Sequence, residues 1–169
     1  FVFLKNKILT LETILPVLFE IKENRNIIFV SDNMGQYQSF KSNYFINTSI
    51  NKLGNLKYTG HANNKILDKI KKLLFLINII FNILFLKKNI KIIHFGNLNH
   101  LIYKLLFKIN NSNTIYSEPA SSGLKSLSRI NNPLYIKKTK YHSIGKTLIL
   151  YNHFESKNIV SLKKRYPHL

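Results

Sequence analysis

The sequence predicts an α/β fold, in which a Rossmann-like, mostly parallel sheet carries helices on both faces. The first observation is an alternation, about five times along the chain, of short apolar runs with longer segments of helical periodicity. The second is the character of the apolar runs themselves. Asn26–Asp32, NIIFVSD, is almost continuously apolar, which is typical of a parallel strand buried on both faces.

Apolar runs predict the individual strands, which we place at Phe1–Leu4, Asn26–Asp32, Lys91–His94, Thr114–Ser117 and Thr147–Tyr151, with a weaker one at Asn43–Asn47. Apolar residues three and four positions apart predict helices at Leu11–Lys22, from Asn63 to about Leu86, at Leu98–Ile109 and at Glu155–Lys164. The expected N-caps are Thr10 for the first helix and Asn63 or Asn64 for the long one. Residues 119–145 are rich in Ser, Asn, Gly and Pro and are expected to form a loop.

The composition limits the classes of partner. The chain has 169 residues, and 26 Lys and Arg against 7 Asp and Glu give it a formal net charge of +19. Such a charge attracts anions, so acidic phospholipids, phosphate-bearing ligands and nucleic acid are the candidates. Arginine is the preferred side chain for reading bases and phosphates, and it stands only at Arg25, Arg129 and Arg165, which makes nucleic acid the least favoured. The lack of cysteine excludes disulfides, thiolate catalysis and cysteine-ligated zinc.

The predicted long helix contains an uncharged apolar stretch, Leu73–Leu86, with lysines before and after it. A helix that crosses a bilayer needs about 20 apolar residues, so this stretch is too short. Two interpretations stay open. Either the stretch is buried against the sheet, or it is partly exposed to lipid while the lysines of residues 69–88 contact anionic headgroups. Asn78 and Asn82 lie on one side of the helix and are expected to mark a side that does not face the core.

The motifs that bind metals and cofactors are not found. The sequence has no HExxH and its histidines are scattered, so no metal site is expected. No GxGxxG follows the first predicted strand, so nothing supports a dinucleotide, and GxSxG is missing as well. Gly145-Lys146-Thr147 fails as a phosphate-binding loop, because Lys140 stands where that motif requires glycine and a strand is expected where it requires a helix. No cofactor is expected.

Polar residues follow the predicted strands, and ligands of open parallel sheets bind beyond the carboxyl ends of strands. The candidates for substrate binding are Lys5, Lys7, Asp32, Asn33, Gly96 and Asn97. The candidates for catalysis, which can act as general bases by residue type, are His94, Glu118 and His153. Asp and Asn at a strand end also cap helices, so capping is the competing interpretation for Asp32 and Asn33.

Four stretches carry a resemblance to a known family: ETILPVLFEIKEN, NIIFVSDN, KIIHFGNLN and NTIYSEP. They resemble the N-terminal lobe of the two-lobed, GT-B type glycosyltransferases of bacterial surface-polysaccharide synthesis, over most of residues 1–118 and again over 147–165. The resemblance implies that residues 1–146 form an acceptor-binding lobe. Residues 147–169 would then form a last strand–helix unit or the start of the interlobe region.

The resemblance also implies an activity. A nucleotide-sugar, bound by a C-terminal lobe beyond this chain, would give its sugar to a lipid-linked or saccharide acceptor. Lys5 and Lys7 would meet a phosphate of the acceptor, and the three catalytic candidates would assist deprotonation of its hydroxyl. The implied location is cytoplasmic, with peripheral contact to the inner face of the cytoplasmic membrane. Because the chain begins at Phe1 and stops where another strand is expected, we expect a fragment that is inactive by itself.

Two other functions remain open. One is a polyol-phosphate transferase of similar fold, which differs only in the donor. The other is a non-enzymatic basic module that binds nucleic acid. The family's glycine-rich turn after the first strand is replaced here by Lys5-Asn6-Lys7.

Overall fold

The computed structural model describes residues 1–4, 8–21, 26–61, 64–95, 101–117 and 147–149, and it confirms the Rossmann-like α/β class. Strands and helices alternate along the chain, and the pairs of strands within each unit described below are parallel. The chain divides into two compact units, residues 1–90 and 91–169. The domain boundary expected at residue 146 lies outside the described residues, so it stays a prediction.

Three parallel strands form the sheet of the first unit. They are β1 (Val2–Phe3), β2 (Ile27–Ser31) and β3 (Gly54–Tyr58), and β2 lies between the other two. The register of β2 with β3 runs from Ile27 opposite Gly54 to Ser31 opposite Tyr58. Gly54 is required there, because a Cβ at this position would collide with the backbone of Ile27. The strands predicted at Phe1–Leu4 and Asn26–Asp32 are thereby confirmed.

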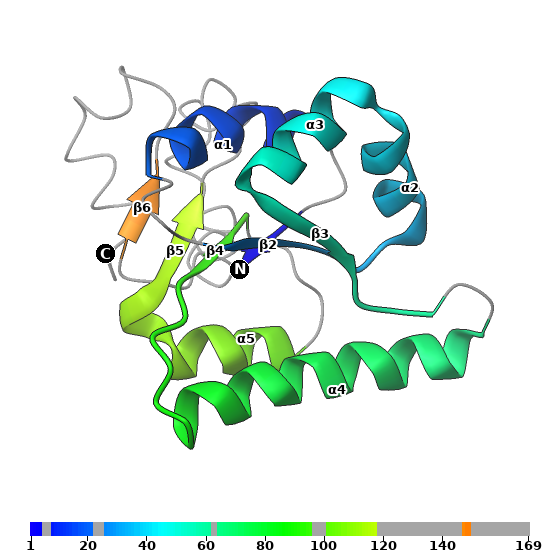
Figure 1. Ribbon diagram of the computed structural model, residues 1–169. Helices are drawn as coiled ribbons and strands as arrows, with labels where there is room; N and C mark the ends of the chain where they lie inside the picture. Colours follow the sequence, from blue (N-terminus) through cyan, green and yellow to red (C-terminus); the bar gives the residue numbers. More distant parts are fainter. Residues whose placement is uncertain (5–7, 22–25, 62–63, 96–100, 118–146, 150–169) are drawn as a thin grey trace, which may run out of the picture. The chain divides into compact units, whose positions relative to one another are not determined.

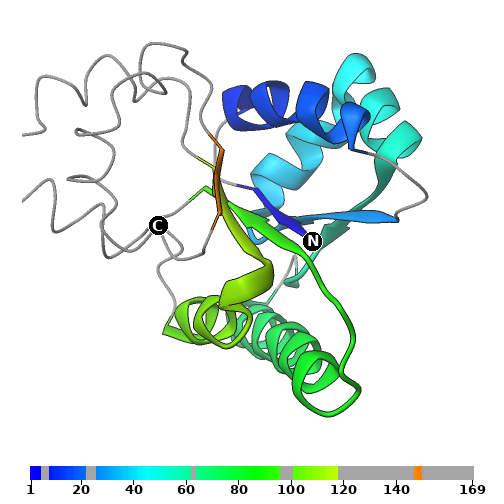
Figure 2. The ribbon, with the colours of Figure 1, turned by 90° about the vertical axis from the view of Figure 1, so that its left-hand side faces the viewer.

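Helices cover both faces of this sheet (Figures 1 and 2). On one side lie α1 (Ile8–Glu20) and α3 (Tyr44–Leu53), and α4 (Lys65–Leu84) lies on the other, while α2 (Met34–Ser42) connects β2 to α3. Apolar side chains from the strands and helices fill the core, among them Phe3, Leu11, Ile14, Leu18, Phe29, Phe40, Ile50, Leu53 and Leu76. The burial of these side chains is the main force that holds the layers together.

The weak strand predicted at Asn43–Asn47 is wrong, because this segment begins α3. The side chain of Asn43 accepts a 3.1 Å hydrogen bond from the backbone N of Ile46 and so caps the helix. Ile46, Ile50 and Leu53 are buried at spacings of four and three residues, which is the period of a helix. This longer period outweighs the strand propensity of the local run YFI.

Two other details differ from the sequence analysis. Thr10 lies inside α1, which begins at Ile8, and therefore does not cap it. The elements α2 and β3 were not predicted at all. The long helix, by contrast, is confirmed, and Asn64 is its N-cap, with a side-chain oxygen that accepts from the backbone N of Ile66 and of Leu67.

The apolar stretch of α4 has one buried side and one exposed side. Leu76 and Ile79 are buried, whereas Leu74, Ile77 and Phe81 are about half exposed. The interpretation of the stretch as core therefore holds for one face only. In the part of the chain that the structure describes, no helix is both long and apolar enough to span a bilayer.

The second unit has three parallel strands and one described α-helix. The strands are β4 (Ile92–His94), β5 (Thr114–Ser117) and β6 (Thr147–Ile149), with β5 in the middle. Helix α5 (Leu101–Ile109) buries Tyr103, Leu106 and Phe107, and the 3₁₀ helix η1 (Asn111–Asn113) leads into β5. These elements confirm the strands predicted at 91–94 and 114–117. The predicted loop 119–145 and helix 155–164 lie outside the described residues.

Candidate functional site

The parallel register of the first unit brings two polar strand ends together. Ser31 at the end of β2 lies opposite Tyr58 at the end of β3. Thr59 follows Tyr58, and its backbone N donates a 3.1 Å hydrogen bond to the carbonyl oxygen of Ser31. Ser31 and Thr59 are both buried. The ends of β2 and β3 are therefore held together by a hydrogen bond between buried residues. The predicted residues Asp32 and Asn33 follow directly after the end of β2.

The hydroxyl of Ser31 organises the turn after β2. Its Oγ lies 3.0 Å from the carbonyl oxygen of Asn33 and 2.9 Å from Oε1 of Gln36, and the backbone N of Asn33 lies 3.4 Å from the same Oγ. A serine hydroxyl donates one proton and accepts through its lone pairs. The contacts of this one oxygen therefore hold Asn33 and Gln36 close to the end of β2.

Asn33 caps α2, which confirms the capping role that was predicted as the alternative to substrate binding. Its backbone is extended, with φ −116° and ψ 123°, and its side-chain oxygen accepts a 2.9 Å hydrogen bond from the backbone N of Gln36. Asn33 is nevertheless exposed, so its amide Nδ2 remains accessible to a ligand. Asp32 beside it is partly exposed. In the described part of the chain, no hydrogen bond or ion pair engages the Asp32 carboxylate.

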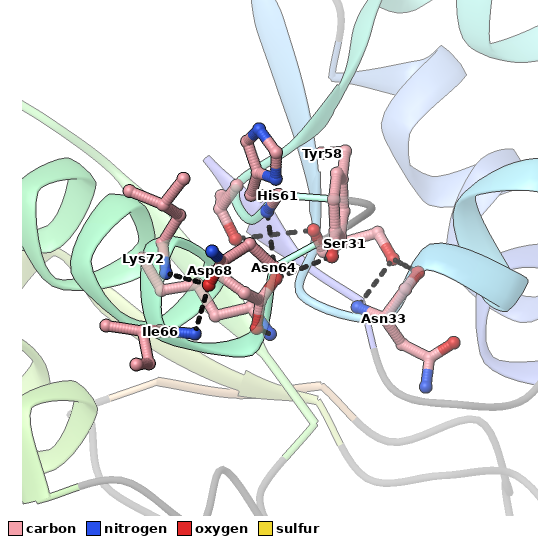
Figure 3. A network of polar contacts seen from close by, with 10 residues as sticks. Ser31, Asn33, Tyr58, His61, Asn64, Ile66, Asp68 and Lys72 are labelled. Carbon is pink, nitrogen blue, oxygen red and sulfur yellow. Dashed lines mark hydrogen bonds and ion pairs between the residues drawn. The ribbon is translucent and has the colours of Figure 1, made fainter.

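A second polar cluster centres on Asp68, in the first turn of α4 (Figure 3). Its Oδ1 accepts a 2.7 Å hydrogen bond from the hydroxyl of Tyr58 and a 2.9 Å hydrogen bond from the backbone N of His61. Its Oδ2 forms a 2.6 Å ion pair with Nζ of Lys72, one turn further along the helix. The hydrogen bonds from Tyr58 and His61 thus tie β3 and the segment after it to α4, whereas the ion pair with Lys72 lies within the helix.

Burial, hydrogen bonds and charges in this cluster shift two pKa values. Burial raises the pKa of Tyr58 to about 12, and its hydrogen bond to Asp68 and the negative charges of Asp68 and Asp32 act in the same direction. Burial also tends to raise the pKa of Asp68. The hydrogen bonds from Lys72, Tyr58 and His61 outweigh burial, so the pKa of Asp68 lies below its ordinary value. Asp68 is therefore a stable anion and Tyr58 a stable proton donor at neutral pH.

Gly60 is the residue that lets this cluster close. A Cβ at this position would collide with Oδ1 of Asp68 and with the hydroxyl of Tyr58. The backbone must therefore pass directly over the carboxylate, which only glycine permits. This close approach also places His61 beside the end of β3.

The two clusters differ in what they can do chemically. The donors around Asp68 satisfy its carboxylate, so the cluster acts as a structural clamp. The turn after β2 instead presents an accessible carboxylate at Asp32 and an accessible amide at Asn33. A carboxylate accepts hydrogen bonds and an amide donates them, which is the pair needed to bind the hydroxyl groups of a polar ligand.

Among the catalytic candidates, His94 alone lies within the described residues, and it is part of the core of the second unit. Its ring stacks on Phe107 with centroids 4.2 Å apart and meets the ring of Tyr116 at 5.5 Å. The side chain is buried, with 1% of its surface exposed. Apart from Asp32 and Asn33, the other candidate site residues lie outside the described residues; they are Lys5, Lys7, Gly96, Asn97, Glu118 and His153.

Tyr58, His61 and Asp68 were not predicted as site residues, because β3 was not predicted. The residues of β3, GNLKY, are only partly buried, so they lack the apolar run that marks β2. The sequence feature that could have indicated these residues is the polar run YTGH, because it is followed by Asn64, which caps a helix. Within the described residues, no group of three or more His, Asp or Glu side chains could hold a metal ion.

Comparison of the chain with protein families, with curated proteins and with solved structures gives no match.

Proposed function

We propose that this chain is the acceptor-side lobe of a glycosyltransferase, which moves a sugar from a nucleotide-activated donor to a membrane-associated acceptor in surface-polysaccharide synthesis. The observation that carries the proposal is the turn after β2, where Asp32 and the Nδ2 group of Asn33 are accessible at the carboxyl edge of a parallel sheet. This edge is where open α/β sheets bind their ligands. The resemblance of the four sequence stretches described above supports the same function.

The proposed chemistry divides the work among a few side chains. Asp32 accepts hydrogen bonds from hydroxyl groups of the acceptor, and the amide of Asn33 donates a hydrogen bond to them. Gly96 and Asn97 provide further polar contacts. Lys5 and Lys7 neutralise a phosphate of the acceptor. One of His94, Glu118 and His153 removes the proton of the attacking hydroxyl. The donor binds to a second lobe outside this sequence. A polyol-phosphate donor in place of the nucleotide-sugar would use the same acceptor residues.

The proposed place of action is the inner face of the cytoplasmic membrane, where the protein is peripheral. An acceptor linked to a lipid stays in the membrane, so the lobe that binds it must work at that surface. The net charge of +19 favours attraction to an anionic leaflet.

The test is saccharide binding to the turn after β2, measured by NMR with the whole chain and a panel of methyl glycosides and alkyl-phosphate glycosides. Asn33→Ser keeps an oxygen that caps α2 but removes the amide, and Asp32→Asn removes the charge. We expect each substitution to weaken binding by on the order of tenfold, because a hydrogen bond in the site is lost.

Asn64→Ser is the matched control, since it makes the same change at the cap of α4. It is expected to leave saccharide binding unchanged. If no glycoside in the panel binds, or if Asn33→Ser and Asn64→Ser weaken binding equally, the proposal is wrong. A basic module for nucleic acid would instead bind a DNA or RNA duplex with an affinity that falls steeply as salt increases.

A further inference from the structure

Helix α4 carries a continuous apolar stripe on the side that faces away from the core. We define the exposed face of α4 by six large apolar side chains, which are Ile66, Ile70, Leu73, Ile77, Phe81 and Leu84; Leu67 and Leu74 are also exposed and border this face. The side chains that define the face follow one another at spacings of four and three residues and fall within an arc of about 80° at 100° per residue. Their exposed fractions range from 43% for Leu73 to 71% for Ile66. The stripe therefore runs the whole length of the helix.

The core contacts of α4 lie on a different side. Leu76 and Ile79 are the buried residues of this helix, and their direction is centred about 130° from that of the exposed face. A surface helix normally presents polar residues opposite its buried side. Here that position is apolar, and contiguous exposed apolar surface of this kind marks an interaction site.

Lysines stand at both ends of the exposed face and none stands within it. Lys65, Lys69 and Lys71 are exposed in the first two turns, and Lys87 and Lys88 are exposed just after the helix ends. Between them, from Leu73 to Leu86, no residue is charged. The only acidic residue of the helix, Asp68, is already engaged by Lys72.

The end of the helix holds the second lysine pair in place. Lys87 adopts a left-handed backbone with φ 49°, and the backbone N of Lys88 donates a 3.1 Å hydrogen bond to the carbonyl oxygen of Asn82. Phe81 and Phe85 stack beside this turn, with ring centroids 4.9 Å apart. Aromatic rings next to cations form a pattern suited to the boundary between headgroups and acyl chains.

We infer that the exposed face of α4 is a docking surface for an anionic lipid bilayer. The helix lies in the plane of the interface, with Ile70, Ile77 and Phe81 in contact with the acyl chains. Its terminal lysines contact acidic headgroups on either side. The inference rests on the peripheral placement proposed above and does not depend on sugar transfer.

A second copy of the chain fits this surface less well than a bilayer does. Two α4 helices packed face to face would bring lysine ends against lysine ends, whether they ran parallel or antiparallel. The helix offers no unengaged carboxylate to neutralise them. An anionic leaflet neutralises both ends at once, because its charge is spread along the surface. Nucleic acid would pair with the lysines but not with an aliphatic stripe.

The placement of α4 in the first unit sets an orientation at the bilayer. Helices α1 and α3 lie on the opposite face of the sheet from α4 (Figures 1 and 2). When α4 rests on the membrane, α1 and α3 therefore point toward the aqueous side.

The test is sedimentation of the whole chain with vesicles of phosphatidylcholine alone and of phosphatidylcholine mixed with phosphatidylglycerol. We expect binding to the mixed vesicles and weak binding to the neutral ones. The double variant Ile77→Ser, Phe81→Ser is expected to lower the partition coefficient by on the order of tenfold or more, because it removes apolar area from the contact. Lys87→Gln and Lys88→Gln are expected to lower it roughly fivefold each.

The matched control is Tyr44→Ser, Phe45→Ser, which removes two exposed aromatic side chains from α3 on the other face of the sheet. It is expected to bind vesicles like the wild type. Equal loss in both double variants, or binding that ignores phosphatidylglycerol, would overturn the inference. So would a dimer in gel filtration that Ile77→Ser, Phe81→Ser converts to a monomer, since the occupant would then be a second copy.

The outcome is independent of the saccharide experiment. Ile77 and Phe81 lie away from the turn after β2, so the double variant is expected to keep its affinity for glycosides. Conversely, Asn33→Ser is expected to keep vesicle binding. A failure of the docking surface and a failure of the glycosyltransferase proposal are therefore seen in different assays.

Discussion

The hydroxyl of Tyr58 donates a 2.7 Å hydrogen bond to Oδ1 of Asp68, and this bond joins the end of β3 to the first turn of α4. The same carboxylate holds the backbone of His61 and the side chain of Lys72. One partly buried anion therefore sets the path of the chain from the sheet to the helix that carries the exposed apolar stripe.

Replacement of Tyr58 by Phe is expected to lower the free energy of unfolding by about 1–2 kcal/mol. The phenyl ring keeps the packing, but Asp68 loses a donor while it remains partly buried. Urea unfolding followed by circular dichroism measures the effect. Tyr44→Phe is the control, because Tyr44 is 75% exposed, and no measurable change is expected there. Equal stability of the Tyr58→Phe variant and the wild type would contradict the role of this bond.

Acidification is expected to remove the contribution of Asp68 to stability. Because the pKa of Asp68 is lower in the folded state, its contribution is fully present above the unfolded-state pKa of about 4. It is lost as the pH falls through the folded-state value. Asp68→Asn should therefore be less stable than the wild type at pH 7, and the difference should shrink below about pH 4. Melting temperatures of both proteins between pH 7 and pH 2 check this, and parallel curves would argue against it.

The ionisation of Tyr58 gives a prediction at alkaline pH. Its folded-state pKa of about 12 lies above the unfolded value of about 10, so the neutral phenol contributes stability below pH 10. That contribution is lost as the pH rises through about 12. The wild type and the Tyr58→Phe variant are titrated with base while absorbance at 295 nm is recorded. The difference between the two curves is expected to show one tyrosine that ionises near pH 12. A midpoint near 10 would disprove the partial burial of this phenol beside Asp68.

Alanine at Gly60 and at Gly35 should have opposite effects. A Cβ at Gly60 would collide with Asp68 and Tyr58, so Gly60→Ala is expected to destabilise the fold by about 1–3 kcal/mol. At Gly35, inside α2, the nearest atom to a Cβ is Oδ1 of Asn33 at 3.4 Å. Gly35→Ala is therefore expected to stabilise the protein by up to about 1 kcal/mol, through helix propensity. Chemical denaturation of both variants measures the two changes in unfolding free energy. Changes of the same sign and size would contradict the prediction.

Burial on both faces made β2 predictable. Its residues Ile28, Phe29 and Val30 are all apolar, since a central parallel strand has no polar side. Strand β3 pairs with β2 alone among the described strands and has Asn55 and Lys57 exposed, so its composition resembles a loop. The period of Ile46, Ile50 and Leu53 identifies α3 only when the window extends past Asn47.

The candidate site was predictable in part for the same reason. Asp32 and Asn33 follow a strand that the sequence reveals, so their place at the carboxyl edge could be expected. Asp68 and Tyr58 meet only after β3 is placed beside β2, and their contact depends on Gly60, which has no signature of its own in the sequence. The packing of His94 between Phe107 and Tyr116 likewise depends on the tertiary fold.

The two faces of α4 give the last prediction, because they separate stability from binding on a single helix. Leu76 is buried, whereas Leu74, which borders the exposed face, is 58% exposed. Leu76→Ala is therefore expected to cost about 2–5 kcal/mol of unfolding free energy, through lost burial and a cavity. Leu74→Ala is expected to cost less than about 0.5 kcal/mol. Urea unfolding of the two variants measures both values. Similar losses at the two positions would mean that both faces are packed inside the protein, and the exposed face would then not be available to a bilayer.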